Sequence, residues 1–518
     1  MKEILYIQAG SLANYVGTHF WNTQESYRES SADSDGLASE IDHDVSFREG
    51  VNHDGESTYC PRLLVFDHQA NFGALSQSNA LYGEDDNDRD HVLQNMAWSG
   101  NTIEYEREAI LPSNYQVNLD LENSEDVSPA AQLRDIRYWS DFTRPYYVPR
   151  TVQKVPDVPE WEKESARGNW AAGHETFVRY DENTGLMEGP VRTFLEECDT
   201  IQGIQVVHET GSFGSFVHSL LSALHDEGTK IPVMTFPLLA EVGSLHNRHT
   251  LRLAINDALT LRGLGELSLL NVPIQHPAAW HLDIFESEYI HATRSHPYHM
   301  SAILSAHIES ATLPLRLKAS NHDIYSFAGQ LCGGTAPLAS LTGIFPLCSS
   351  LKMSQLPEHL YSLSPGSRPR LSEGTRSYSR HNVTRGLSQS AITAYDEAML
   401  AKTIQWMLGP VISTHAGAYP LPNSFPAFFR PTDGLYRFHS SVAAVTSLSV
   451  TEQTPVFLDQ YVKLLKKGRA VCIQAATDLG LEKDEMLELA ADLQTLKDRF
   501  SAGDGSESDV VHNESDEE

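Results

Sequence analysis

The sequence predicts an α/β protein whose first half folds around a mostly parallel sheet. Short apolar runs are typical of buried strands, and the segments between them have helical spacing. Glycines stand where strands give way to helices. This alternation of strands and helices is the pattern of a parallel sheet covered by helices. A chain of 518 residues is long enough for roughly two to four domains.

These patterns place the elements of the first half in order. Residues 4–10 form an apolar strand that ends at Gly10, and helical spacing follows from Leu12 to Trp21. Residues 62–67 form a second buried strand closed by Asp67. Further strands are expected at 201–207 and 231–239, and helices at 189–198, 216–225 and 248–262.

The second half has a different composition. Residues 351–386 are rich in Ser, Pro, Gly and Arg, which predicts a mobile basic loop, either a solvated linker or a contact for an acidic partner. Helical periodicity returns at 390–408 and 483–500. Residues 504–518 are acidic and almost free of apolar side chains, which predicts a disordered tail.

The charge and composition exclude several classes of function. With 38 Lys+Arg, 69 Asp+Glu and a net charge of −31, the chain is not expected to bind nucleic acid, because neutralising phosphates needs a basic face. No apolar stretch approaches the roughly 18 residues of a membrane span, so no transmembrane segment is expected. Five scattered cysteines without a C-x-x-C pair and the lack of H-E-x-x-H indicate a reduced compartment and no metal site. The N-terminal residues resemble neither a signal peptide nor a presequence, so a cytosolic origin is expected.

Glycine turns between a strand and a helix are the usual anion sites of α/β folds, because the helix N-terminus offers free N–H groups. The sequence has such turns at Gly10, at 168–173 and at 211–214. If several of them lie at one edge of the sheet, they form a nucleotide site. The alternative is that they are tight turns without a ligand.

Four segments, in order, resemble the tubulins. MKEILYIQAGSLANYVGTHFWN is similar to the tubulin N-terminus, RGNWAAGHET to AGNNWAKGHYT, and CDTIQGIQVVHETGSFGSF to the stretch that contains the phosphate loop GGGTGSG. The sequence NDAL, which begins at Asn256, is similar to N-E-A-L, whose asparagine faces the guanine base. WSDFTRPYYVPR at residues 139–150 resembles the Misato family, tubulin-like proteins whose fungal branch is linked to mitochondrial distribution and inheritance.

The resemblance implies a Rossmann-type, tubulin-like nucleotide-binding domain with large insertions, followed by a smaller α+β domain and C-terminal helices. Residues 1–115 would be the Misato segment that begins this domain, and residues 116–310 would complete it with an aromatic insertion. Residues 311–500 would hold the second domain, the basic loop and the helices, and 501–518 the disordered tail. The implied nucleotide site is degenerate and consists of Gly10, Ser11, Asn14, Asp67, Gly168, Asn169, Gly211, Ser212, Gly214, Ser215 and Asn256.

Departures from tubulin argue against catalysis. Ser11 replaces the glutamine that reaches the phosphates, and Phe213 and Phe216 interrupt the phosphate loop, so we expect their rings to fill the phosphate cradle. Tubulin-like polymers also use N-x-D-x-x-E, and in the nearest match, residues 321–326, the glutamate is Ser326. Hydrolysis would lack a carboxylate to orient water. No GTPase activity is expected, and GTP is not a firm cofactor.

The resemblance implies a non-catalytic protein that serves partitioning, distribution and morphology of mitochondria and inheritance of mitochondrial DNA. It would associate peripherally with mitochondria and keep a cytoplasmic pool. Two alternatives stay open. One is an active GTP-binding switch or polymer-forming GTPase, and the other is a tubulin-assembly or chaperonin cofactor that binds tubulin or the cytosolic chaperonin.

Overall fold

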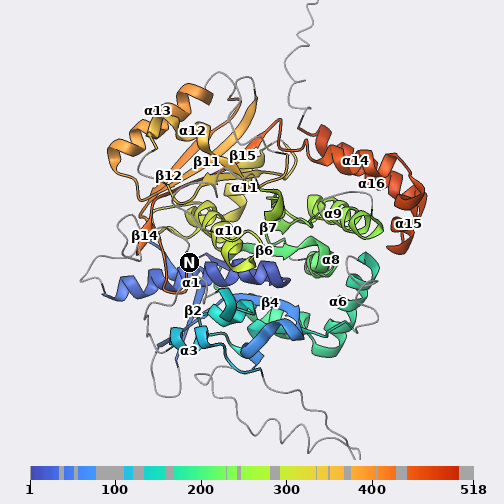
Figure 1. Ribbon diagram of the computed structural model, residues 1–518, viewed down its shortest axis with the longest axis horizontal. Coiled ribbons are helices and arrows are strands. Elements are labelled where there is room, and N and C mark those ends of the chain that lie inside the picture. The colour runs from blue at the N-terminus through green and yellow to red at the C-terminus, as the bar shows by residue number, and fades with distance from the viewer. Residues whose placement is uncertain are drawn as a thin grey trace, which may run out of the picture.

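The computed structural model describes residues 2–33, 40–51, 57–76, 110–120, 133–158, 169–228, 230–241, 247–280, 292–333, 335–347, 351–366, 375–403, 407–427 and 440–500. The strands are β1 (Glu3–Ala9), β2 (Phe47–Val51), β3 (Ser57–Pro61), β4 (Leu63–His68), β5 (Val152–Val155), β6 (Ile201–Glu209), β7 (Val233–Leu238), β8 (Leu270–Asn271), β9 (Ser340–Ile344), β10 (Tyr361–Ser362), β11 (Ser377–Arg385), β12 (Val411–Ala416), β13 (Tyr419–Pro420), β14 (Ser441–Val442) and β15 (Ala444–Thr451). The helices are α1 (Ser11–Asp33), α3 (Asn114–Asp120), α6 (Trp170–Thr184), α7 (Arg192–Glu196), α8 (Thr210–Asp226), α9 (Arg248–Leu267), α10 (Pro297–Thr312), α11 (Ile324–Cys332), α12 (Leu356–His359), α13 (Gln389–Thr403), α14 (Leu458–Lys466), α15 (Ala470–Asp478) and α16 (Lys483–Asp498) (Figure 1).

Six parallel strands form the first sheet, in the order β5-β4-β1-β6-β7-β8. The predicted α/β class is therefore confirmed. In the centre of the sheet, Ala9 of β1 lies between Phe66 of β4 and His208 of β6. Because the strands are parallel, β1, β4 and β6 all end at one edge of the sheet, where the candidate site lies.

Helices cover both faces of this sheet, as the alternating side chains of a strand require. Leu5 and Ile7 of β1 belong to one buried cluster with Phe216 of α8. Ile4 and Tyr6 point the other way and belong to a larger cluster with residues of α1, α9 and α10. The apolar runs of the sequence are therefore continuous because both faces of each central strand are buried.

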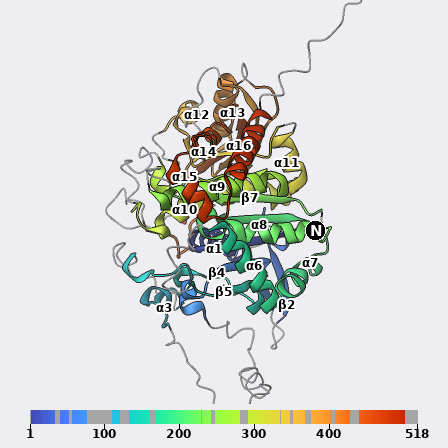
Figure 2. The same cartoon turned by 90° about the vertical axis from the view of Figure 1, so that its right-hand side faces the viewer.

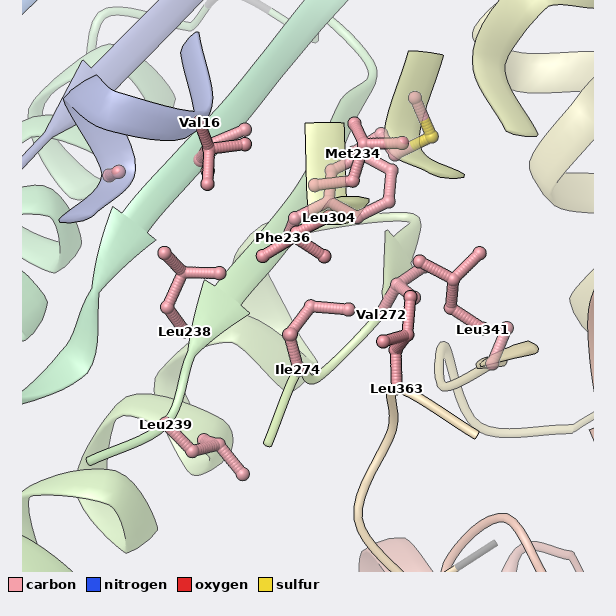
Figure 3. Close-up of a cluster of buried hydrophobic side chains, with 14 of the residues drawn as sticks. Val16, Met234, Phe236, Leu238, Leu239, Val272, Ile274, Leu304, Leu341 and Leu363 are labelled. Atoms are coloured by element: carbon pink, nitrogen blue, oxygen red, sulfur yellow. The ribbon is translucent and has the colours of Figure 1, made fainter. Parts of the chain in front are cut away.

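The second sheet is mixed, with the order β10-β9-β15-β11-β12. Helices α10 and α11 pack against it, and α11 also packs against β6 and β7 of the first sheet. Figure 3 shows the core that this arrangement makes: Val16 of α1, Met234 of β7, Leu304 of α10 and Leu341 of β9 lie in one cluster. Helices α14, α15 and α16 pack on α9. Figure 2 shows α12 and α13 at one end of the molecule and β4 and β5 towards the other.

The structure corrects the prediction that residues 351–386 form a mobile basic loop. Strand β11 lies between β15 and β12, and its Arg380 and Arg385 are only 4% and 2% exposed. The prediction was wrong because the segment is rich in turn-forming and basic residues, although part of it forms the buried strand β11. Residues 367–374, which include Arg368 and Arg370, and the predicted tail at 501–518 lie outside the described residues.

Candidate functional site

The site lies where β1, β4 and β6 end and where α1 and α8 begin. Gly10, between β1 and α1, has a φ of 103°, which favours glycine. A Cβ atom at Gly10 would lie 2.9 Å from the carboxyl carbon of Glu209, the last residue of β6. The backbone at Gly10 and the side chain of Glu209 are therefore in direct contact.

The Glu209 carboxylate binds the N-terminus of α1. It accepts hydrogen bonds from the backbone N–H groups of Leu12 and Ala13. The Ser212 hydroxyl, in the first turn of α8, donates a third hydrogen bond of 2.8 Å to it. A helix N-terminus attracts negative charge through its free N–H groups and its dipole. A carboxylate of the chain itself thus occupies the position at which a phosphate would approach α1.

Burial sets the protonation behaviour of Glu209. It raises the pKa of the Glu209 carboxyl, and the nearby Asp67 carboxylate raises it further. The hydrogen bonds from Ser212 and from the α1 backbone act in the opposite direction. The fold therefore holds an acidic group in a partly dehydrated position, where hydrogen bonds from Leu12, Ala13 and Ser212 stabilise the charge.

Asp67, the second acidic group of the site, is completely buried. One of its oxygens accepts hydrogen bonds from the Asn14 amide and the Trp139 indole, each at 3.1 Å. The other oxygen accepts them from the Asn71 amide at 2.7 Å and from the His68 backbone N–H at 2.8 Å. Burial raises the pKa of Asp67, and these hydrogen bonds oppose the shift. Four protein donors thus satisfy the carboxylate.

The small residues of the turn at 211–214 serve contact between helices. A Cβ atom at Gly214 would lie 2.5 Å from the Oγ1 atom of Thr260 on α9. A Cβ atom at Gly211 would lie 3.3 Å from Leu253 of the same helix. On the side of α6, Ser215 donates a 2.6 Å hydrogen bond to the Trp170 carbonyl. These positions are small because α6 and α9 pack closely on α8.

The predicted asparagines hold helix ends in place. Asn256 is 3% exposed, and its amide donates a hydrogen bond to the Thr210 carbonyl at the start of α8. Asn169 caps α6 by accepting a 3.2 Å hydrogen bond from the Ala172 N–H. Ser11 begins α1 and is partly exposed. Gly168 lies outside the described residues.

The structure corrects the prediction that Phe213 and Phe216 fill the phosphate cradle. Both rings lie in the buried cluster that contains Leu5 and Ile7 of β1, where Phe216 contacts Phe66 at a centroid distance of 5.3 Å. The Phe213 ring lies 5.4 Å from that of His68. The apolar face of an amphipathic helix packs against the core, and both phenylalanines lie on that face of α8. The group that does meet Gly10 is Glu209.

The match to N-x-D-x-x-E lies at the opposite edge of the sheet. Asp323 caps α11 by accepting a 2.8 Å hydrogen bond from the Ser326 N–H. A Cβ atom at Gly203, near the beginning of β6, would lie 2.7 Å from the side chain of Ile324, the residue that follows Asp323. These residues are therefore at the amino end of β6, away from Glu209.

The structure thus brings Gly10, Asn14 and Asp67 together, and it adds two residues that the sequence reasoning missed, Glu209 and Trp139. The signal for Glu209 was its place between a strand and a glycine turn. These side chains do not fit a guanine nucleotide as they stand. The N–H groups of Leu12 and Ala13 are bonded to Glu209. The amide nitrogen of Asn256, the predicted base contact, donates to the Thr210 carbonyl, while its buried Oδ1 has no hydrogen-bond partner among the described residues.

Two family comparisons match adjoining parts of the chain. Residues 2–121 match the Misato Segment II tubulin-like domain, and residues 128–317 match the Tubulin domain. Together they cover every residue of the candidate site. The chain belongs to the Misato/DML1 family. The resemblance to Misato proteins and to the tubulin fold is thereby confirmed.

Relatives in this family come from fungi and animals. Protein dml1 of Aspergillus clavatus is 35% identical over 332 residues, which are 64% of this chain and 63% of that protein. Protein DML1 of Gibberella zeae is 35% identical over 351 residues, 66% of this chain and 67% of the relative. Protein misato homolog 1 of Homo sapiens is 25% identical over 574 residues, 97% and 98% of the two chains. The match to the Aspergillus clavatus protein thus spans less than two thirds of its length.

Proposed function

We propose that this Misato/DML1 protein is a non-catalytic, tubulin-like scaffold. It serves the partitioning, distribution and morphology of mitochondria and the inheritance of mitochondrial DNA. The family is linked to mitochondrial distribution. The observation that supports a non-catalytic role is the bond between the Glu209 carboxylate and the N-terminus of α1.

This bond matters because a phosphate and a carboxylate compete for the same donors. A nucleotide that used the α1 amides would have to displace Glu209 and place its own negative charge beside Glu209 and the buried Asp67 carboxylate. Repulsion between like charges in a partly dehydrated site is costly. A scaffold that keeps the tubulin fold and acts through partner surfaces needs no such displacement.

The test of this role is the nucleotide content of the freshly purified full chain. The protein is denatured, and the released nucleotides are separated by anion-exchange chromatography, with a known GTP-binding protein handled in parallel. We expect no guanine nucleotide, and no rise in melting temperature with millimolar GTP and magnesium. Guanine nucleotide bound in a one-to-one ratio would overturn the proposal and favour a GTP-binding switch or polymer.

We also propose peripheral association with mitochondria beside a cytoplasmic pool. Among the parts of the chain that the structure describes, no helix has both the length and the apolar character of a membrane span. Fractionation of cells that express the full chain should yield a mitochondrial fraction of the protein that high salt releases. Stoichiometric co-purification with tubulin or the cytosolic chaperonin, without mitochondrial sedimentation, would instead favour an assembly cofactor.

A further inference from the structure

A hollow of about 420 Å³ lies among α9, α14 and α15. Its exposed lining is mainly apolar and includes Leu251 of α9, Leu464 of α14 and Val471 of α15. Val471 is 49% exposed, which is unusual for a branched apolar side chain on a helix. The volume lies in the range of ligand-binding pockets.

The rim of this hollow is basic. Lys463, Lys467 and Arg469 line it, and Lys466 lies between them in the sequence KLLKKGR. All four side chains are exposed, and none of them forms an ion pair with a carboxylate of the described residues. Four cations within seven residues contrast with the net charge of −31 of the whole chain. An apolar floor with a cationic rim fits an acidic ligand with an apolar centre.

The chain itself contains a segment of this chemistry. Residues 504–518 carry seven acidic residues, no Lys or Arg, and the adjacent pair Val510 and Val511. Acidic residues stand on both sides of the pair, with Asp509 directly before it. The segment therefore complements the hollow: its apolar pair matches the apolar floor, and its flanking acidic residues match the basic rim.

The geometry of the last helix puts this segment within reach. Helix α16 packs against α14, and a 2.6 Å bond joins Lys497 near the end of α16 to Asp459 near the start of α14. The hollow runs along α14 from Gln460 to Lys467, so its far end is within about 14 Å of Asp459 along this nine-residue helix. Ten residues separate Phe500 from Val510 and can span roughly 33 Å when extended.

We propose that the acidic segment 504–518 docks in this hollow. Val510 and Val511 cover the apolar floor, and the flanking carboxylates lie against Lys463, Lys467 and Arg469. A tether of this length gives an effective concentration near the millimolar range, so the intramolecular contact needs only modest intrinsic affinity. An acidic segment of another protein would bind the hollow only by displacing this one. The inference does not depend on whether the candidate nucleotide site binds a ligand.

Carbodiimide cross-linking of the full chain tests the contact, because this reagent joins lysines only to carboxylates that touch them. We expect cross-links from Lys463 and Lys467 to carboxylates of 504–518, and their loss in 1 M salt, where the screening length falls to about 3 Å. Lys230 and Lys352, which are exposed and lie outside the hollow, are the matched controls. Mixing isotopically labelled and unlabelled chains separates cross-links within one chain from those between two.

Two variants keep the reactive lysines and change their surroundings. Val510→Asp/Val511→Asp and Arg469→Glu should each reduce the yield at Lys463 and Lys467 by roughly tenfold, since they place charge on the apolar floor or reverse the rim. Arg179→Glu, an exposed change on α6, should leave the yield unchanged. Equal yields at Lys230 and Lys352, cross-links mainly between two chains, or no response to Val510→Asp/Val511→Asp would each overturn the proposal.

Discussion

The carboxylate of Glu209 accepts a hydrogen bond from the backbone N–H of Leu12, across 197 residues of sequence. Glu209 ends a central strand, and Leu12 lies in the first turn of the helix that follows the neighbouring strand. In an α/β sheet these two positions flank the place where phosphates bind. The bond therefore couples the stability of the fold to the state of the candidate site.

The first prediction concerns the stability that this carboxylate provides. Glu209→Ala leaves two N–H groups of α1 without their acceptor and should lower the free energy of unfolding by about 1–2 kcal/mol. Glu209→Gln should cost less, because its amide oxygen still accepts a hydrogen bond and carries no charge that burial disfavours. Urea unfolding at neutral pH measures both. Glu175→Ala on the exposed face of α6 is the control, and equal midpoints for Glu209→Ala and the control would contradict the prediction.

The second prediction is that the same change creates an anion site. In Glu209→Ala the N–H groups of Leu12 and Ala13 become available, so inorganic phosphate should raise the melting temperature of this variant as its concentration rises. The unaltered protein should not respond beyond the effect of chloride at the same ionic strength. A phosphate response of equal size in both proteins would show that Glu209 does not block the helix N-terminus.

The third prediction tests whether position 214 requires glycine because of packing against α9 or because a ligand approaches the backbone there. An added methyl would lie 2.5 Å from Thr260 Oγ1, so Gly214→Ala should cost about 1–3 kcal/mol of unfolding free energy. In a Thr260→Ala background the loss should shrink, because the colliding atom is gone. Gly329→Ala in α11 is the matched control: nothing lies within 4 Å of its added methyl, and helix propensity favours alanine. Equal losses in both backgrounds would exclude the contact as the cause.

The elements of the first sheet were predictable because the information that specifies them is local. The apolar run of β1 and the periodicity of α9 each describe a surface that must be buried. Strand β11 was not predictable in this way, since its sequence SYSRHNVTR alternates poorly and contains two arginines. Arg385 is buried there because Glu309, 76 residues earlier, neutralises it. No local pattern records such a partner.

The candidate site shows the same division. The sequence patterns predicted the end of β1 at Gly10, the strand that holds Asp67 and the helix that holds Asn256, but the partners of these groups come from distant segments. Trp139 donates to Asp67 from 72 residues away. The phenylalanines at 213 and 216 were misplaced because the direction of a side chain at the start of a helix depends on which neighbouring helices pack there. Motifs therefore specify the turn, whereas tertiary packing decides what fills it.

The fourth prediction concerns the buried charges that connect α10 to the second sheet. Glu309 of α10 bonds Arg316 at 3.1 Å and Arg385 of β11 at 2.8 Å, and all three side chains are almost completely buried. Glu309→Gln leaves two buried guanidinium groups without a counter-charge and should cost about 3–5 kcal/mol. The urea midpoint measures the loss. Glu188→Gln removes an exposed partner of Arg192 and should not move the midpoint. Similar midpoints for the two variants would contradict the prediction.

The last prediction is a pH dependence that originates at Asp257. This α9 carboxyl is fully buried and accepts hydrogen bonds from Thr210 at 2.5 Å and Tyr461 at 3.2 Å. Burial outweighs these bonds and raises the pKa of Asp257 from 3.8 to about 7. The folded state therefore keeps a proton that the unfolded chain has already lost. The stability contributed by this group is complete below about pH 4 and is lost as the pH rises to about 7.

Asp257→Asn cannot titrate, so it isolates this contribution. Urea unfolding of both proteins at about pH 5 and about pH 8 should show the unaltered protein losing stability relative to Asp257→Asn at the higher pH. The general repulsion of a highly acidic chain affects both proteins alike and cancels in the comparison. Asp492→Asn on α16 removes an exposed partner of Arg262 on α9, and this variant should follow the pH profile of the unaltered protein. If Asp257→Asn also runs parallel to that profile, the Asp257 carboxyl is ionised in the fold throughout this range, and the charge is stabilised by Thr210 and Tyr461.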